Sequence, residues 1–239
     1  MTEPLPASLW DDLKVASAAT LSTVLIRHGL GRTMMQGVFP LRRGSRLAGE
    51  AMTLRFVPAR EDLGNPAMLA DPEYPQRKAV ENIPAGKVLV VDARGELRAG
   101  ILGDILVTRM AARGAAGLVT DGALRDAASI RRMEWPVFAA GAHPAQHTDR
   151  HFAVGIDEII ACGGVAVVPG DVIVGDDDGV VVLPRAVAAE IAREARAQDE
   201  LETFVQRKIA GGASIRGVYP PNDATRAEFE AWRREQRKA

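Results

Sequence analysis

The sequence predicts an α/β fold, and three observations carry this prediction. The continuous apolar runs "KVLVVDA" and "GLVTDG" are typical of strands buried on both faces, and "PVFAAG" is a third such strand. The segment "GDILVTRMAARG" lies between the first two runs and has the pattern of a helix that ends at Gly114. Strands and helices therefore alternate along the chain, which indicates an α/β core.

Composition sets limits on the class of protein. The chain has 239 residues, of which 47% are apolar and 26% charged, so it can bury a large core as one domain over 1–239. The net charge of −1 provides no strong field for nucleic acid, and we expect no nucleic-acid partner. The single cysteine, Cys162, excludes an internal disulfide and a zinc site of several cysteines, and we expect it in the core.

No targeting or membrane segment is expected. The start, "MTEPLPASLWDDLK", is polar and acidic, unlike a signal peptide. No apolar stretch approaches the length that crosses a bilayer. We therefore expect a cytoplasmic protein without a membrane partner.

The N-terminal part predicts one helix, one strand and one loop. Ser8 with Asp11 resembles an N-cap, and the apolar spacing after it favours a single amphipathic helix that stops at Gly29. In "AMTLRFV" the apolar and polar residues alternate, which predicts a strand with only one buried face. The segment "DLGNPAMLADPEYPQ" is rich in turn formers and predicts a loop or lid.

The C-terminal part predicts short strands, a long helix and a tail. The strands are "GVAVVPG", "DVIVGD" and "GVVVLP". Between the last two, Asp176–Gly179 favours a hairpin turn over a calcium site, because an EF-hand loop with its closing Glu is missing. A long helix follows Pro184 and ends at Gly211 and Gly212. The core then spans roughly 10–215, and in the tail, 216–239, we expect a short helix packed on a neighbouring subunit.

The stretch "AGILGDILVTRMAARGAAGLVTDGALRDA" carries the most chemistry. Gly103 and Asp104 begin a predicted helix, whose free N–H groups and dipole favour an anion. Further on, a predicted strand ends at Asp121, and a glycine turn leads to Arg125 and Asp126. Guanidinium can bind a carboxylate through two hydrogen bonds, and a carboxylate can hold a hard divalent cation. The alternative is that Arg125 and Asp126 only cap the next helix.

Other catalytic motifs are missing. The chain has no P-loop, no GxGxxG after a strand and no GxSxG elbow, which argues against nucleotide-binding folds and an α/β-hydrolase. Lysines are few, and nothing near Lys87 suggests the desolvated amine of a Schiff-base enzyme. Carbanion chemistry would then need a metal ion.

The G-D pair, the helix and "ARGAAGLVTDGALRD" together resemble the RraA-like family. "PLRRGSRLAGEAMTLR" and "PGDVIVGDDDGVVVLP" resemble its opening and its closing hairpin. The family contains 4-hydroxy-4-methyl-2-oxoglutarate and 4-carboxy-4-hydroxy-2-oxoadipate aldolases and a regulator of ribonuclease E. The resemblance implies a three-layer β/β/α fold similar to swivelling domains, with an N-terminal helix and a long C-terminal helix, assembled as a trimer or hexamer.

The resemblance also implies a role for each residue of the central stretch. The substrate's oxo-acid end would bind Gly103, Asp104, Ile105 and Leu106 with Arg125, and Asp126 would hold Mg²⁺ or Mn²⁺. Asp104 would also orient a catalytic water, which makes Asp104 and Arg125 the implied catalytic residues. A neighbouring subunit would add acidic residues, for which the candidates are Glu200 and Glu202.

These roles imply a class II-like, divalent-metal-dependent pyruvate-type aldolase. It would cleave a small 4-hydroxy-2-oxo acid to pyruvate and a second carbonyl product. Oxaloacetate decarboxylation is the expected companion activity, since it passes through the same enolate. Two alternatives stay open, which are a non-catalytic regulator of ribonuclease activity and a related lyase or hydratase on another 2-oxo acid.

The stretch "HPAQHTDRH" holds three of the four histidines, His143, His147 and His151. Their spacing allows a metal site on a continuous helix, but Pro144 leaves His143 outside it and no HExxH pattern is present. We favour a polar surface or interface loop. Because it follows the "PVFAAG" strand, it could border the pocket and select the substrate, with His143 as the position to test.

Overall fold

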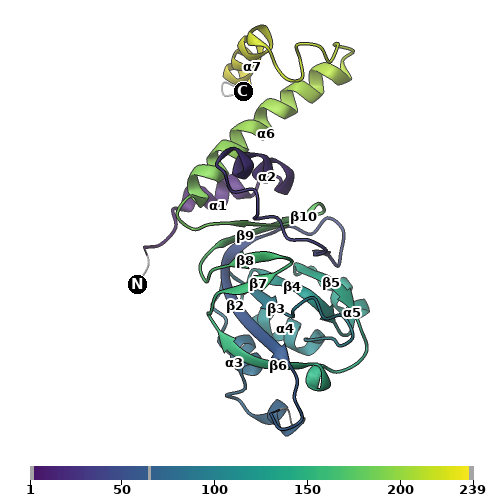
Figure 1. The fold of residues 1–239 in the computed structure, drawn as a ribbon. Coiled ribbons are helices and arrows are strands. Elements are labelled where there is room, and N and C mark those ends of the chain that lie inside the picture. Colours follow the sequence, from purple (N-terminus) through teal and green to yellow (C-terminus); the bar gives the residue numbers. More distant parts are fainter. Residues whose placement is uncertain (1–2, 64–65, 237–239) are drawn as a thin grey trace.

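A mixed sheet organises the fold in the computed structural model, which describes residues 3–63 and 66–236 (Figure 1). The sheet order is β1-β5-β4-β3-β2-β9-β10, with β6 paired to β2. The strands are β1 (Phe39–Pro40), β2 (Leu47–Pro58), β3 (Lys87–Asp92), β4 (Gly117–Leu124), β5 (Val137–Ala142), β6 (His151–Ile156), β9 (Val172–Asp176) and β10 (Gly179–Leu183). The four central strands from β2 to β5 are parallel, and the others pair antiparallel.

Both faces of the central strands are buried, as their continuous apolar runs predicted. In β3, Leu89 and Val91 face the cluster formed with α3 (Pro75–Asn82), α4 (Asp104–Ala112) and α5 (Ala127–Arg132). Val88 and Val90 face the opposite cluster. A parallel strand needs apolar side chains in every position because helices or a second sheet cover each face.

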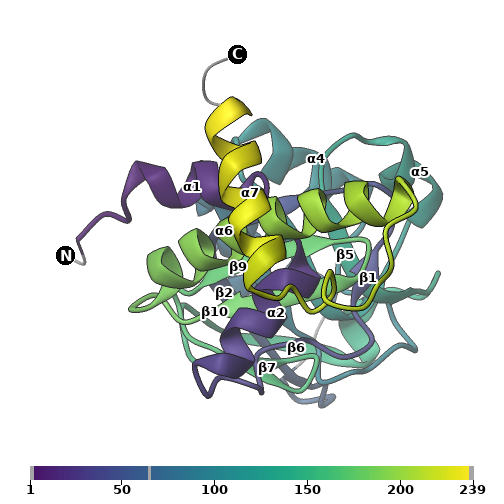
Figure 2. The same cartoon turned by 90° about the horizontal axis from the view of Figure 1, so that it is seen from above.

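The second face is covered by β structure. The small sheet of β7 (Ile160–Cys162) and β8 (Val165–Val167) packs there, and the β9–β10 hairpin curls over the same cluster. Cys162 is fully buried in it, as expected. The other face of the hairpin carries α1 (Ala7–Leu13), α2 (Ala18–Arg27) and α6 (Ala188–Ala210) (Figures 1 and 2). The α/β class and its layers of β structure and helices are therefore confirmed.

The N-terminal helix is two helices, so the prediction of a single helix with Ser8 as N-cap was wrong. The first helix follows Pro6, and no side chain caps it. Ser17 caps the second helix by accepting a hydrogen bond from the Thr20 N–H at 3.1 Å. One continuous helix does not form because the Ser17 and Ala18 N–H groups donate to the carboxylates of Asp199 at 2.9 Å and Asp176 at 2.8 Å, not to carbonyls four residues earlier. Gly29, at φ 76°, ends the second helix as predicted.

Two further segments differ from the expectation. Strand β2 is buried on both faces over Ala51–Leu54, because Thr53 is covered and its hydroxyl donates to the Glu158 carbonyl at 2.6 Å. The expected loop over 62–76 contains a 3₁₀ turn, Pro66–Ala70, and the first residues of α3. Residues 64 and 65 of that expected loop lie outside the described residues.

The C-terminal elements follow the prediction. The hairpin turn places Asp176 opposite Gly179, whose φ is 130°. Helix α6 ends at Gly211. The tail forms α7 (Asp223–Gln236), and Phe229 and Trp232 pack on Phe204 of α6 in the same chain (Figure 2). Packing of this helix on a neighbouring subunit stays a prediction. Tail residues 237–239 lie outside the described residues. None of the described helices is long and apolar enough to cross a membrane.

Candidate active site

The predicted site residues come together at the carboxyl end of β4. The segment that precedes α4 runs beside this end, because the Ile101 N–H donates to the Ala123 carbonyl at 2.9 Å and the Arg125 N–H donates to the Leu102 carbonyl at 2.8 Å. This two-bond ladder fixes Gly103 and Asp104 next to Arg125. Sequence positions more than twenty residues apart are thereby held against each other by backbone hydrogen bonds.

Glycine at position 100 makes this close approach possible. A Cβ atom on Gly100 would lie 2.5 Å from the Arg125 Cγ and 2.7 Å from the Arg125 backbone nitrogen. Both distances are far below a normal contact, and the second involves backbone that cannot move aside. Gly100 therefore lets the chain pass directly behind Arg125, whose side chain lines the cavity in front.

Asp126 has an unusual backbone conformation. Its φ of 57° and ψ of 31° are left-handed, which aspartate tolerates better than most residues. Asp126 occupies the N-cap position of α5 without making a side-chain capping bond, so the capping alternative does not account for its carboxylate. Among the described residues, neither the Asp126 carboxylate nor the Asp104 carboxylate has a hydrogen-bond or ion-pair partner. Both are free to bind a ligand from the cavity.

We expect Gly103→Ala to impair chemistry more than folding. A Cβ on Gly103 would lie 2.6 Å from the Asp126 Oδ2, a side-chain atom that can move away. The displaced carboxylate should bind a divalent cation at least about tenfold more weakly. Mutating residues that only orient a metal ligand already lowers metal affinity by about 10–100-fold. Titration with Mn²⁺ measures this, and thermal unfolding should shift by only a few degrees. An unchanged Mn²⁺ affinity would contradict the expectation.

The N-terminus of α4 faces the same place. The N–H groups of Asp104, Ile105 and Leu106 belong to the first turn, which has no intrahelical acceptors, and the helix dipole adds positive potential there. The three side chains line the cavity together with Gly103. Asp104 and Leu106 are partly buried, whereas Ile105 is 80% exposed. The arrangement suits an anionic group held by backbone N–H donors.

The cavity has a volume of about 310 Å³ and two guanidinium groups in its wall. Arg125 is one, and Arg77 is the other. The Arg77 Nε donates to the Leu69 carbonyl at 3.1 Å, which ties the 3₁₀ turn to α3. Gln76, Gln146 and His147 also line the cavity. The sequence did not single out Arg77 or Gln76, because helix α3 reaches the site only through tertiary packing. Gln146 belongs to the histidine-rich stretch that was expected to border the pocket.

The prediction of a polar surface or interface loop was wrong for two of the three histidines, whereas His143 is partly exposed. His147 is 4% exposed and His151 is fully buried. The His147 ring stacks on Tyr74 at a centroid distance of 6.3 Å, and the His147 and His151 rings both contact Phe56 in an edge-to-face arrangement. Apolar surface from β2 and α3 covers them, which local sequence does not reveal. Of the three, His147 lines the cavity, while His143 does not.

Burial determines the charge of His147 and His151. Desolvation lowers the pKa of His147 to about 4, helped by His151 and the nearby arginines. Desolvation also lowers the pKa of His151 to about 4, helped by Arg94. Both imidazoles are therefore neutral at pH 7, and His147 offers the cavity an uncharged hydrogen-bonding group.

Asp121 does not join this site, and β4 does not end there as predicted but continues to Leu124. The Asp121 carboxylate accepts hydrogen bonds from the backbone N–H groups of Ala93 at 2.8 Å and Gly95 at 3.2 Å. It lines a separate cavity of about 630 Å³ beside Asp92. Burial raises the pKa of the Asp121 carboxyl. Its oxygens accept hydrogen bonds from the loop that follows β3, which is a structural role.

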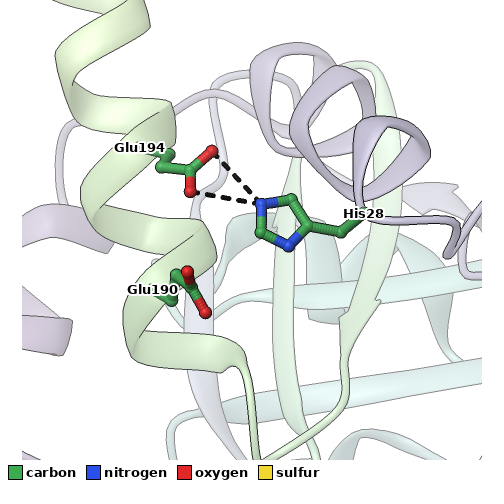
Figure 3. Close-up of side chains that lie close together, drawn as sticks. All are labelled: His28, Glu190 and Glu194. Atoms are coloured by element: carbon green, nitrogen blue, oxygen red, sulfur yellow. Dashed lines mark hydrogen bonds and ion pairs between the residues drawn. The ribbon is translucent and has the colours of Figure 1, made fainter.

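The described residues hold one histidine–carboxylate group with the spacing of a metal site, and it lies elsewhere. His28 follows α2, and Glu190 and Glu194 lie one turn apart on α6 (Figure 3). Their ligand atoms lie within 4.8 Å of one another, and the His28 Nε2 is 3.2 Å from both Glu194 oxygens. None of the three lines the Arg125 cavity. The i,i+4 glutamates were visible in the sequence, but the approach of His28 was not.

The two acidic candidates for a neighbouring site have partners within the chain. Glu200 lies 3.1 Å from Arg233 and 3.7 Å from Arg196. Glu202 accepts a hydrogen bond from the Gln198 amide at 2.8 Å. Both stay predictions as groups that reach another subunit.

The cavity, its guanidinium and its free carboxylates are those expected from the resemblance, and a family model described as RraA-like, Aldolase/RraA, matches residues 14–182. The chain belongs to the RraA-like family. An RraA-like protein named provisionally as a 4-hydroxy-4-methyl-2-oxoglutarate aldolase, from Halalkalibacterium halodurans, is 31% identical over 194 residues, which cover 80% of this chain and 86% of that protein.

Two further comparisons show the breadth of the RraA-like family. Protein DlpA of Legionella pneumophila is 28% identical over 208 residues, which cover 87% of this chain but only 32% of DlpA, so the chain spans about a third of that relative. The crystal structure of RraAS2 from Streptomyces coelicolor, described as an unusual member of the RNase ES inhibitor RraA family, matches with a TM-score of 0.75 and 35% identity. It covers 86% of this chain and 99% of RraAS2.

Proposed function

We propose that this RraA-like protein is a divalent-metal-dependent lyase that cleaves a small 4-hydroxy-2-oxo acid to pyruvate and a second carbonyl compound. The observation that carries the proposal is the Arg125–Asp126 pair, held on the wall of one cavity beside the N-terminus of α4. The relative named provisionally as an aldolase supports the reaction type. Oxaloacetate decarboxylation is the companion activity, because both reactions form the same enolate.

The residues present fit a divalent cation. Asp126 is exposed, and its carboxylate has no partner among the described residues. Its Oδ2 would lie 2.6 Å from a Cβ on Gly103, so only glycine leaves this space beside it open. An oxygen ligand of this kind suits Mg²⁺ or Mn²⁺, which keep several waters in their shell. Asp126 would hold the cation, which when bound would supply Lewis-acid polarisation of the 2-oxo group.

The chain's own residues would do the rest. The Arg125 guanidinium would bind the carboxylate of the oxo acid and stabilise the negative charge that develops on the enolate oxygen. The N–H groups of Asp104 to Leu106 would hold the same acidic end. A water held by the Asp104 carboxylate would take the proton from the substrate's 4-hydroxyl group as the C–C bond breaks and return a proton to the enolate carbon.

A substrate panel tests the proposal. Pyruvate release is measured from 4-hydroxy-4-methyl-2-oxoglutarate, from oxaloacetate and from other 2-oxo acids, with Mg²⁺ or Mn²⁺ and with EDTA. We expect turnover of both named acids that EDTA abolishes and either cation restores. Turnover that is indifferent to EDTA would contradict the metal dependence. Turnover of a different 2-oxo acid alone would point to the related lyase or hydratase.

The similarity to RraAS2 also favours a second candidate, a regulator that binds a ribonuclease without catalysis. Binding to a ribonuclease of the E type is therefore measured by calorimetry beside the panel. Micromolar binding together with no turnover of any 2-oxo acid would replace the enzyme with the regulator. For either function we propose a trimer or hexamer, in which Glu200 or Glu202 could approach a neighbouring cavity, and sedimentation measures that state.

A further inference from the structure

Three buried polar atoms without a hydrogen-bond partner among the described residues belong to residues that line a single cavity. They are the Gln76 Oε1, the Arg125 Nε and the His147 Nε2. Buried polar groups are nearly always paired, because an unpaired one loses its hydrogen bonds to water without replacement. Three such atoms around one cavity indicate groups that a ligand satisfies. In the proposed function, the substrate's carboxylate pairs with Arg125. Gln76 and His147 are then the two residues without a partner.

Gln76 presents an acceptor and nothing else. Its side chain is 1% exposed, and its amide nitrogen already donates to the Ile101 carbonyl at 2.5 Å. That bond fixes which end of the amide is the nitrogen, since a carbonyl needs a donor. The remaining atom, Oε1, therefore requires a donor from the ligand, and the carboxylate and keto oxygens of a 2-oxo acid are only acceptors.

His147 presents a neutral nitrogen in a fixed direction. Stacking on Tyr74 and contact with the Phe56 edge hold the ring. Tyr74 is itself fixed, because its hydroxyl accepts a hydrogen bond from the Ala153 N–H at 3.0 Å. An imidazole held this way cannot turn to seek another partner, and a neutral ring with its proton on Nε2 donates one hydrogen bond.

We propose that Gln76 and His147 form a hydroxyl-recognition pair that selects 2-oxo acids carrying a hydroxyl group over those without one. A hydroxyl is both donor and acceptor, so in the bound substrate it satisfies both side chains at once by donating to the Gln76 Oε1 and accepting from the His147 Nε2, before the water held by Asp104 takes its proton. The inference rests on the proposed function and makes it more specific. Gln76 and His147 act in binding and positioning, while the Arg125 and Asp126 chemistry is common to both kinds of substrate.

The test compares a hydroxylated substrate with one that lacks the hydroxyl. In His147→Phe, which keeps the stack on Tyr74, kcat/KM for 4-hydroxy-4-methyl-2-oxoglutarate should fall by about 10- to 100-fold, and that for oxaloacetate decarboxylation by less than about threefold. His147→Gln, whose amide nitrogen can replace Nε2, should restore most of the loss. Gln76→Met should shift selectivity in the same direction. His143→Gln on the same segment, outside the cavity, should change neither reaction.

Equal losses for both substrates, or none, would overturn the proposal, and unfolding curves identify any variant that fails to fold. If the wild-type protein turns over neither substrate, the proposed function fails, but the hydroxyl pair is still tested by equilibrium binding. Wild type should then bind 4-hydroxy-4-methyl-2-oxoglutarate about tenfold more tightly than 4-methyl-2-oxoglutarate. His147→Phe should bind the two alike. Equal binding by wild type would overturn the hydroxyl pair separately.

Discussion

Arg125→Ala is expected to lower kcat for pyruvate release from oxaloacetate by about 10²–10³-fold, the usual cost of removing a donor that stabilises a developing oxyanion. The Arg125 Nε is buried without a partner among the described residues, so the guanidinium is held for a ligand. Arg125→Lys keeps the charge but loses the planar fork, so most of the loss should persist. Arg131→Ala removes an exposed arginine of α5 and is the matched control.

Asp126→Asn is expected to remove activity through the cation. Asparagine tolerates the left-handed conformation, so the backbone should stay in place while the charge is lost. Mn²⁺ should bind at least about 100-fold more weakly, because the loss of residues that only orient a metal ligand already lowers the affinity by about 10–100-fold. Asp178→Asn, in the exposed hairpin turn, should leave both binding and turnover unchanged. Full activity in Asp126→Asn and Arg125→Ala together would remove this cavity from the mechanism.

The free energy of unfolding is expected to fall as the pH drops from 7 to 5. The folded pKa of both His147 and His151 is about 4, below the ordinary value of 6.5. Between those two values the unfolded chain binds more protons, so stability is lost on acidification and fully present above pH 6.5. Each histidine should account for about 2 kcal/mol between pH 7 and 5. Urea unfolding at pH 5, 6 and 7 measures the change.

Variants separate the histidines from other titrating groups. The raised pKa values of the Asp121 and Asp171 carboxyls, both caused first by burial, act in the opposite direction, because the folded state takes up those protons more readily. His151→Phe should remove about half of the histidine contribution, whereas His143→Gln should leave it intact. A pH dependence that is the same in His151→Phe and wild type would contradict the assignment.

The parts of the fold predicted from sequence are those that neighbouring residues determine. Buried parallel strands show as continuous apolar runs, and glycines such as Gly114, Gly179 and Gly211 lie at the ends of elements as expected. The break between α1 and α2 was missed because the apolar spacing continues across it. The N–H groups of Ser17 and Ala18 at the break donate to Asp199 and Asp176, which are distant in sequence, so local spacing does not report the break.

In the candidate site too, some features follow from neighbouring residues and others from tertiary packing. Arg125 and Asp126 follow a strand, and Gly103 and Asp104 begin a helix, so their meeting at one sheet edge could be anticipated. Gln76 and His147 reach the cavity only because Tyr74, the N-cap residue of α3, packs against the 3₁₀ turn that contains His147. A histidine-rich stretch is polar by composition, and its burial depends on the rings of Phe56 and Tyr74, which are more than fifty residues away in sequence.

The left-handed backbone at position 126 narrows the set of amino acids that evolution can place there. Glycine, asparagine and aspartate accept such a conformation readily, whereas glutamate meets the steric cost common to longer side chains, about 1–2 kcal/mol. Of these tolerated residues, only aspartate carries a charge. The main-chain conformation therefore favours aspartate over glutamate at position 126, independently of any requirement of catalysis.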